Sequence, residues 1–220
     1  MEMIEGFGIR EFQLWVLLCM DFPGGVEHVS AALETLGSSR EEMRAWGDRE
    51  QAIPQVPVEN LTITIHAAGE SPTSHPMPTV PCSWLLEFYT SVLGDPVCEG
   101  LERRRKGMLG HRLLRWSLPL WPELWFEVAV GADGLLASST RLVRRDDMPA
   151  VMLRDVTDLR SWSTTLDDID RCAFGPTVDS GDNFGPGNKT MLFTAPDRRG
   201  RYREYYGRFG YDLLLEVGRA

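Results

Sequence analysis

Polar and apolar residues alternate in several segments of the chain, and this period of two predicts β-strands. The clearest segment is 116–136, in which residues 125–130 alternate between two faces ahead of an Asp133-Gly134 turn. This pattern predicts a strand that enters a β-hairpin, with its return strand at 135–143. Other predicted strands are 61–65, 97–105, 111–118, 191–194, 211–217 and segment 12–22, which is apolar on both faces and is expected to be a central buried strand.

Apolar residues three and four positions apart predict helices in other segments. The predicted helices are 26–36, 40–49, 81–93, 159–169 and 201–209. Gly37 is placed to cap the first helix, Ser39 to Glu42 form a capping box before the second, and Pro81 suits the first turn of the third. The proline-rich segment 67–80 and the glycine-rich segment 174–188 are expected to be loops.

Segment 201–209 allows two interpretations. Its arginines and tyrosines are the residue types that grip single-stranded nucleic acid. Its four rings also have helical spacing, which would turn them inward and leave the arginines in solvent. We favour the amphipathic helix, because an acidic chain repels phosphate.

These elements together predict an α+β protein with mostly antiparallel sheet and several short packing helices. The balance of charge changes near residue 100: residues 1–102 hold 4 basic and 16 acidic side chains, whereas residues 103–220 hold 19 basic and 16 acidic. No Lys or Arg occurs between Arg49 and Arg103. We therefore expect two sub-domains, an acidic half 1–100 and a half 101–220 with the tryptophan-rich hairpin, or one continuous domain with this asymmetry.

Composition narrows the classes of protein. No apolar run approaches the ~18 residues that span a bilayer, and Glu2 and Glu5 stand where a signal peptide carries basic residues. A soluble, cytoplasmic protein without membrane contact is expected. The four cysteines lack the paired spacing of zinc or redox sites, so free thiols are predicted and neither a metal ion nor a cofactor is expected. Asp179, Asp182 and Asn183 offer oxygen ligands, but a plain turn-rich loop explains them better.

Two short segments resemble parts of known families. Residues 87–94, Glu-Phe-Tyr-Thr-Ser-Val-Leu-Gly, resemble the helix of the vicinal oxygen chelate superfamily, which implies a βαβββ module with metal ligands on its strands. The proline-rich loop before this helix is longer than that pattern allows. Residues 104–110 are similar to the acetyl-coenzyme A loop of GNAT acetyltransferases, in which backbone amides hold pyrophosphate, but the glycines are one residue too far apart.

No local motif of nucleophilic or metal-dependent catalysis is present. We therefore predict a non-catalytic protein-binding module, such as an inhibitor, immunity-type or accessory factor, that recognises a basic protein surface and not double-stranded nucleic acid. The candidate contact residues in the acidic half are Glu50, Glu59, Glu70 and Glu87.

The alternative is a small-molecule-binding protein or enzyme with an aromatic-lined pocket. Trp116, Trp121 and Trp125, together with the helix of Phe88 and Tyr89, would form the walls of that pocket.

Overall fold

The computed structural model describes residues 6–50, 59–65, 73–79, 82–102, 111–131, 137–181 and 187–220. The helices are α1 (Ile9–Cys19), α2 (Val26–Thr35), α3 (Arg40–Glu50), α4 (Cys82–Leu93) and α5 (Leu166–Asp170), with 3-10 turns at Pro23–Gly25 and Val156–Asp158. The strands are β1 (Glu59–Ile65), β2 (Thr73–Thr79), β3 (Cys98–Glu102), β4 (His111–Leu118), β5 (Trp121–Val130), β6 (Ala137–Arg144), β7 (Val178–Asp179), β8 (Asn188–Pro196), β9 (Tyr202–Gly210) and β10 (Leu213–Arg219).

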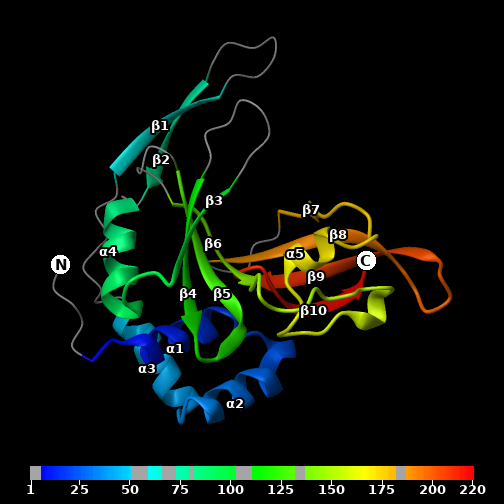
Figure 1. Ribbon diagram of the computed structural model, residues 1–220, viewed down its shortest axis with the longest axis horizontal. Helices are drawn as coiled ribbons and strands as arrows, with labels where there is room; N and C mark the ends of the chain where they lie inside the picture. The colour runs from blue at the N-terminus through cyan, green and yellow to red at the C-terminus, as the bar shows by residue number, and fades with distance from the viewer. Residues whose placement is uncertain are drawn as a thin grey trace.

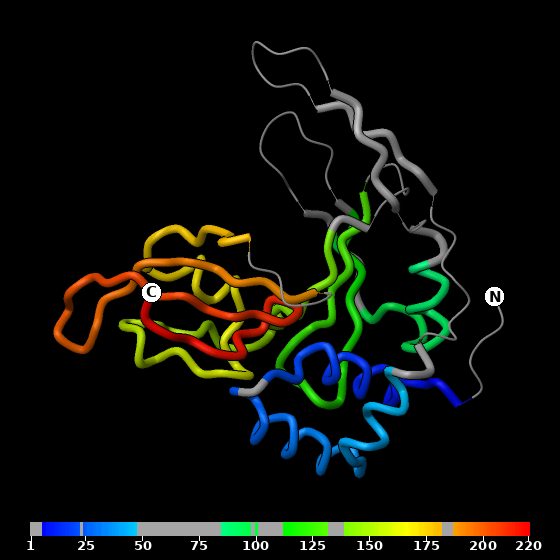
Figure 2. The backbone as a smooth tube through the Cα atoms, turned by 180° about the vertical axis from the view of Figure 1, so that it is seen from behind, coloured from blue at the N-terminus to red at the C-terminus, as the bar shows by residue number. Residues whose placement is uncertain are grey.

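The fold is α+β with antiparallel pairing, as the sequence predicts (Figure 1). Strands β3-β4-β5-β6 form the first sheet, strands β10-β9-β8-β7 form the second sheet, and β1 pairs with β2 apart from both. The two views agree that the second sheet lies beside the first, on the side away from α4 (Figures 1 and 2). Gly100, near the change of charge, lies within β3 of the first sheet, and the division into two domains stays a prediction.

Helices α1 and α4 cover one face of the first sheet, and α2 and α3 pack against α1. Phe126 of β5 is fully buried, with its ring centroid 5.1 Å from that of Phe12 in α1 and 5.3 Å from that of Tyr89 in α4. The predicted hairpin is confirmed, because β5 pairs with β6 in antiparallel register. Its turn at Asp133-Gly134 lies outside the described residues.

Several other predictions are confirmed. The helices predicted at 26–36, 40–49 and 81–93 correspond to α2, α3 and α4, and Gly37 adopts the left-handed conformation of a C-terminal cap, with φ 58°. The strands predicted at 61–65, 97–105, 111–118, 191–194 and 211–217 correspond to β1, β3, β4, β8 and β10. Pro81 and segment 104–110 lie outside the described residues.

Segment 12–22 is not the central strand that its pattern predicts, because residues 9–19 form α1. Phe12, Val16 and Met20, four residues apart, are fully buried, and so is Leu14 on another side of the helix. A helix that is covered on several sides has apolar residues at nearly every position. Its pattern then cannot be told from that of a buried strand.

Two further predictions are wrong, because each of the two segments forms a strand that pairs with a neighbouring strand. Segment 201–209 is a strand: Tyr205 and Phe209 are buried while Glu204 and Arg208 are exposed, and β9 pairs with β8 along its length. The helical spacing of the tyrosines is coincidental, since neighbouring strands override local preference. Within the predicted loop 67–80, residues 73–79 form β2 and pair with β1.

The helix predicted at 159–169 is shorter in the structure. Only residues Leu166–Asp170 are helical, and they form the short helix α5. Trp162 has φ 64°, a left-handed conformation that ends any regular helix. Helix α5 begins after Thr165, its N-cap residue, whose hydroxyl accepts a hydrogen bond from the backbone N–H of Asp168. Leu166 and Ile169 then pack on the second sheet, as their spacing predicts.

The turn between β9 and β10 joins the two sheets. Tyr211 and Asp212 both have positive φ, 48° and 64°, which matches the right-handed twist of a two-residue hairpin. The Tyr211 ring enters the core of the first sheet, where its centroid lies 6.1 Å from that of Trp15. The backbone N–H of Leu142 in β6 donates to the Tyr211 carbonyl at 2.6 Å. The second sheet is therefore anchored in the first through its hairpin turn.

Candidate functional site

Helix α2 presents two carboxylates to solvent. Val29 and Leu33 are buried on its inner face, whereas Glu27 and Glu34 are exposed. Residues seven positions apart lie on the same side of an α-helix, two turns from each other. No Lys or Arg occurs between Arg10 and Arg40, so α2 carries no Lys or Arg side chain. The outer face of this helix is therefore anionic.

Helices α1 to α4 together form the helical layer of the molecule. Other carboxylates of this layer make ion pairs with arginines. Nη1 and Nη2 of Arg10 in α1 lie 2.8 and 3.0 Å from the two carboxylate oxygens of Glu42 in α3, and the Ser38 hydroxyl donates to the same carboxylate at 2.7 Å. These hydrogen bonds lower the pKa of Glu42 to about 2, and those from Arg10 have the largest effect. Arg40 likewise lies 2.8 Å from Asp21, so these acids contribute to folding.

Five carboxylates of the N-terminal half differ from these. Glu27, Glu34, Glu41, Glu87 and Asp95 are exposed, and none makes an ion pair with another described residue. Among the described residues, the ion pairs that arginines of the second half make are with acids of the second half, as for Arg115 with Glu127 and Arg208 with Glu216. Within the described ranges, the acidity of the N-terminal half is therefore not neutralised by the other half.

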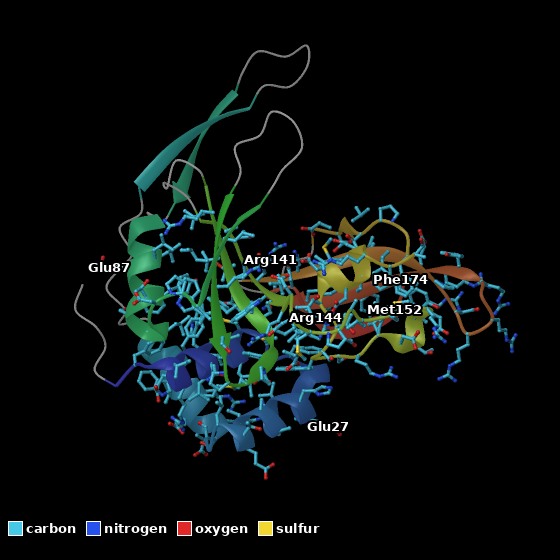
Figure 3. The ribbon with its side chains drawn as sticks, in the orientation of Figure 1. Glu27, Glu87, Arg141, Arg144, Met152 and Phe174 are labelled. Carbon is cyan, nitrogen blue, oxygen red and sulfur yellow. The ribbon has the colours of Figure 1, made fainter. Side chains whose placement is uncertain are left out.

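The structure places the predicted acidic contact residues on different elements. Glu87 is exposed on α4 and projects away from the first sheet, whereas Glu27 lies at the far end of the helical layer (Figure 3). Glu50 ends α3 and Glu59 begins β1, but their side chains, like the whole of Glu70, lie outside the described residues. Glu27 and Glu34 were missed, although the helical spacing of 26–36 and the absence of basic residues there would have identified them.

The three predicted tryptophans lie in the first sheet. Trp116, Trp121 and Trp125 are 1, 3 and 8% exposed. The Trp116 indole nitrogen donates to the Gly94 carbonyl at 2.8 Å, and the guanidinium of Arg145 lies 4.1 Å from the Trp125 ring. All three side chains are therefore buried within the protein. Two surface hollows, of about 320 and 360 Å³, are lined by residues of the second sheet and contain no tryptophan.

The sequence gives no sign of a buried charge in β5. Glu127 is fully buried, and its carboxylate lies 2.7 Å from Arg115 of β4 and 2.7 Å from Arg141 of β6. The first sheet brings these three side chains into one cross-strand row, Arg115 opposite Glu127 and Glu127 opposite Arg141. A buried carboxylate with two cationic partners is satisfied, so this row is a structural feature rather than a reactive one.

Comparison of the chain with protein-family models, with curated proteins and with solved structures finds no match in any of the three. The described residues contain no group of three or more His, Cys, Asp or Glu side chains placed to hold a metal ion. No helix within the described ranges combines the length and apolar character needed to cross a bilayer.

Proposed function

We propose that the chain is a non-catalytic protein-binding module that recognises a basic protein surface through its acidic N-terminal half. The observation that supports this most directly is the outer face of α2. Glu27 and Glu34 are exposed there on a helix without Lys or Arg, while Arg10 and Arg40 on the neighbouring helices pair with Glu42 and Asp21. An inhibitor, an immunity-type protein or an accessory factor would use such a surface.

The physical basis is long-range attraction rather than any single ion pair. One exposed pair of charges contributes only about 1 kcal/mol at 4 Å in water. Several like charges on one side of a molecule sum to a field that raises the rate of encounter with a cationic partner. Glu87 lies at the other end of the helices from Glu27, so the charges that act together on a partner are those of Glu27 and Glu34 on α2 (Figure 3).

The test measures association with a lysine-rich peptide as the probe, by surface plasmon resonance, between ~0.05 and ~0.5 M salt. Screening over this range should slow association by about tenfold or more. The double variant Glu27→Gln, Glu34→Gln keeps the shape of both side chains and removes two charges. We expect slower association at low salt and a weaker dependence on salt.

The matched control is Asp170→Asn, Asp179→Asn, which removes the same charge from exposed positions of the second half. This variant should associate at the wild-type rate. Equal slowing in both double variants would show that only net charge matters and would contradict a specific surface. Association that is indifferent to salt would contradict the proposal altogether. If the proposal is correct, a partner captured from cell extract should also bind the variant Glu27→Gln, Glu34→Gln more slowly than it binds the wild-type chain.

A further inference from the structure

The hairpin of β8 and β9 carries a run of arginines that the acidic surface of α2 does not account for. Residues 198–203 hold four arginines and no acidic side chain. Arg198 and Arg199 are exposed in the turn, and neither makes an ion pair with another described residue. Arg201 lies 3.0 Å from Asp197. The segment is not the amphipathic helix that would explain its arginines as a solvated face, because it begins β9.

A surface hollow lies beside this run, at the start of β9. Its volume is about 360 Å³, and Tyr202, Arg203, Glu204 and Arg219 are among its lining residues. Neither Arg203 nor Arg219 makes an ion pair with a described residue. Arg219 stands opposite Tyr205, and Arg203 precedes Tyr205 by two residues, so the two arginines are diagonal neighbours across β9 and β10. Diagonal neighbours are about 7–8 Å apart, close enough for two guanidinium groups to reach one anion.

Tyr202 adds an aromatic ring to the same hollow. It is 58% exposed, and its hydroxyl donates to the Ala173 carbonyl at 3.2 Å. This hydrogen bond holds the ring in place, while more than half of the residue stays accessible. Tyr205 and Phe209 of the same strand are buried in the core of the second sheet and cannot contact a ligand. Tyr202 is therefore the ring of this segment that can stack on one.

We propose that this hollow and the arginines of the adjacent turn bind single-stranded nucleic acid. One base stacks on the Tyr202 ring, and Arg203 and Arg219 contact the phosphate next to it. Arg198 and Arg199 attract the phosphates that follow along the strand. Positive charge along the backbone and an exposed ring for the bases are the two features with which proteins bind single strands.

Glu204 favours a nucleotide over other anions. Its carboxylate lines the same hollow and makes no ion pair with a described residue. It would repel the carboxylates of an acidic peptide, but it can accept a hydrogen bond from the amino group of a base. A double strand is also less suitable, because its bases are stacked on one another and cannot reach the Tyr202 ring. The hollow thus suits unpaired nucleotides.

The net negative charge of the chain is compatible with this site. Its acidic excess belongs to residues 1–102, whereas residues 103–220 hold 19 basic and 16 acidic side chains. The turn between β8 and β9 points away from the helical layer in both views (Figures 1 and 2). Exposed charges more than about 10 Å apart are largely screened at ~0.1 M salt. The arginines therefore dominate near the turn, and we expect binding that weakens strongly as salt rises.

The experiment uses the full chain and a fluorescent single strand of about ten nucleotides of mixed sequence, with binding followed by fluorescence anisotropy at low salt. The double variant Arg203→Gln, Arg219→Gln should bind at least about tenfold more weakly than wild type. Its plot of log affinity against log salt should also be shallower, by about 0.7 for each phosphate contact that is lost.

Tyr202 is tested by two variants that differ only in whether the ring is kept. Tyr202→Leu removes the stacking surface and should weaken binding by about fivefold or more. Tyr202→Phe keeps the ring and should retain most of the affinity. Equal losses in these two variants would show that the ring does not stack on a base and would contradict the proposed binding mode.

The matched charge control is Arg44→Gln, Arg171→Gln, which removes two charges from exposed positions on α3 and at the end of α5. This variant should bind the strand as wild type does, and circular dichroism checks that every variant is folded. If it loses as much affinity as the Arg203 and Arg219 variant, the binding follows overall charge and the proposed site is wrong.

Competition separates this ligand from other anions. A glutamate-rich peptide or inorganic phosphate, at the concentration of the strand, should not displace it, and a duplex of the same sequence should bind more weakly. Displacement by the peptide would assign the hollow to an acidic protein, and displacement by phosphate would assign it to a single phosphate group. Either result, or a wild-type chain that does not bind the strand at low salt, would overturn the proposal. Binding of a basic partner through α2 does not involve this hollow, so either proposal can fail without the other.

Discussion

Arg144 and Asp168 connect the first sheet to the helix that covers the second. Nε of Arg144, at the end of β6, lies 3.0 Å from one carboxylate oxygen of Asp168, and Nη2 lies 2.9 Å from the other. The same Nη2 donates to the Ser163 carbonyl at 2.7 Å. The side chains are only 9% and 3% exposed, so this ion pair is shielded from water and from salt.

Asp168→Asn should strongly destabilise the protein. The substitution keeps the shape of the side chain but leaves the buried guanidinium of Arg144 without its counter-charge. Removing one member of a buried pair typically costs about 3–5 kcal/mol in the free energy of unfolding. Urea denaturation measures the loss, and Asp170→Asn, at an exposed position of the same helix, should change the unfolding free energy by less than about 0.5 kcal/mol. Similar values for the two variants would show that the pair contributes little.

Glu42 should make stability depend on pH in the acid range. Its pKa in the folded chain is about 2, against an ordinary value of 4.5, because Arg10 and Ser38 bind the ionised form. A lowered pKa means that the stabilisation is complete above pH 4.5 and is lost as the pH falls toward 2. The difference in unfolding free energy between wild type and Glu42→Gln should therefore shrink over that window. Other paired carboxylates titrate in both proteins and cancel. A constant difference would contradict this assignment.

Gly187→Ala should destabilise the chain more than Gly181→Ala. Both glycines have positive φ, 71° and 79°, and alanine carries a cost of about 1 kcal/mol in that conformation. A Cβ at Gly187 would also lie 3.0 Å from the Tyr211 ring, whereas a Cβ at Gly181 meets nothing within 4 Å. The difference between their thermal unfolding midpoints measures the contact with Tyr211. Equal midpoints would mean that the ring moves aside without cost.

The local sequence predicts an element correctly where its apolar periodicity and the residues at its ends indicate the same kind of structure. Helix α2 has one apolar face and a glycine cap, and β5 alternates ahead of its turn, so both could be read from the sequence. Segments α1 and β9 could not. The first is covered on several sides and carries apolar residues at most positions, and the second has helical spacing of its rings but is held by pairing to β8.

The candidate surface was predictable only in part. The acidity of the N-terminal half is a property of the sequence, but whether a carboxylate is exposed or paired depends on which helices meet. Arg10 reaches Glu42 because α1 packs on α3, and this removes Glu42 from the surface. The hollow beside Tyr202 depends on the pairing of β9 with β10, which brings Arg203 and Arg219 together and which no local pattern of the sequence specifies.

The position of Tyr211 has a consequence for the order of folding. Its ring packs beside Trp15, so one core is built from residues near the two ends of the described chain. Contacts between such distant segments require a very large loop to close, which slows folding. The core of the first sheet is complete only when Tyr211, Leu213 and Leu215, from the last ten residues of the sequence, have joined it.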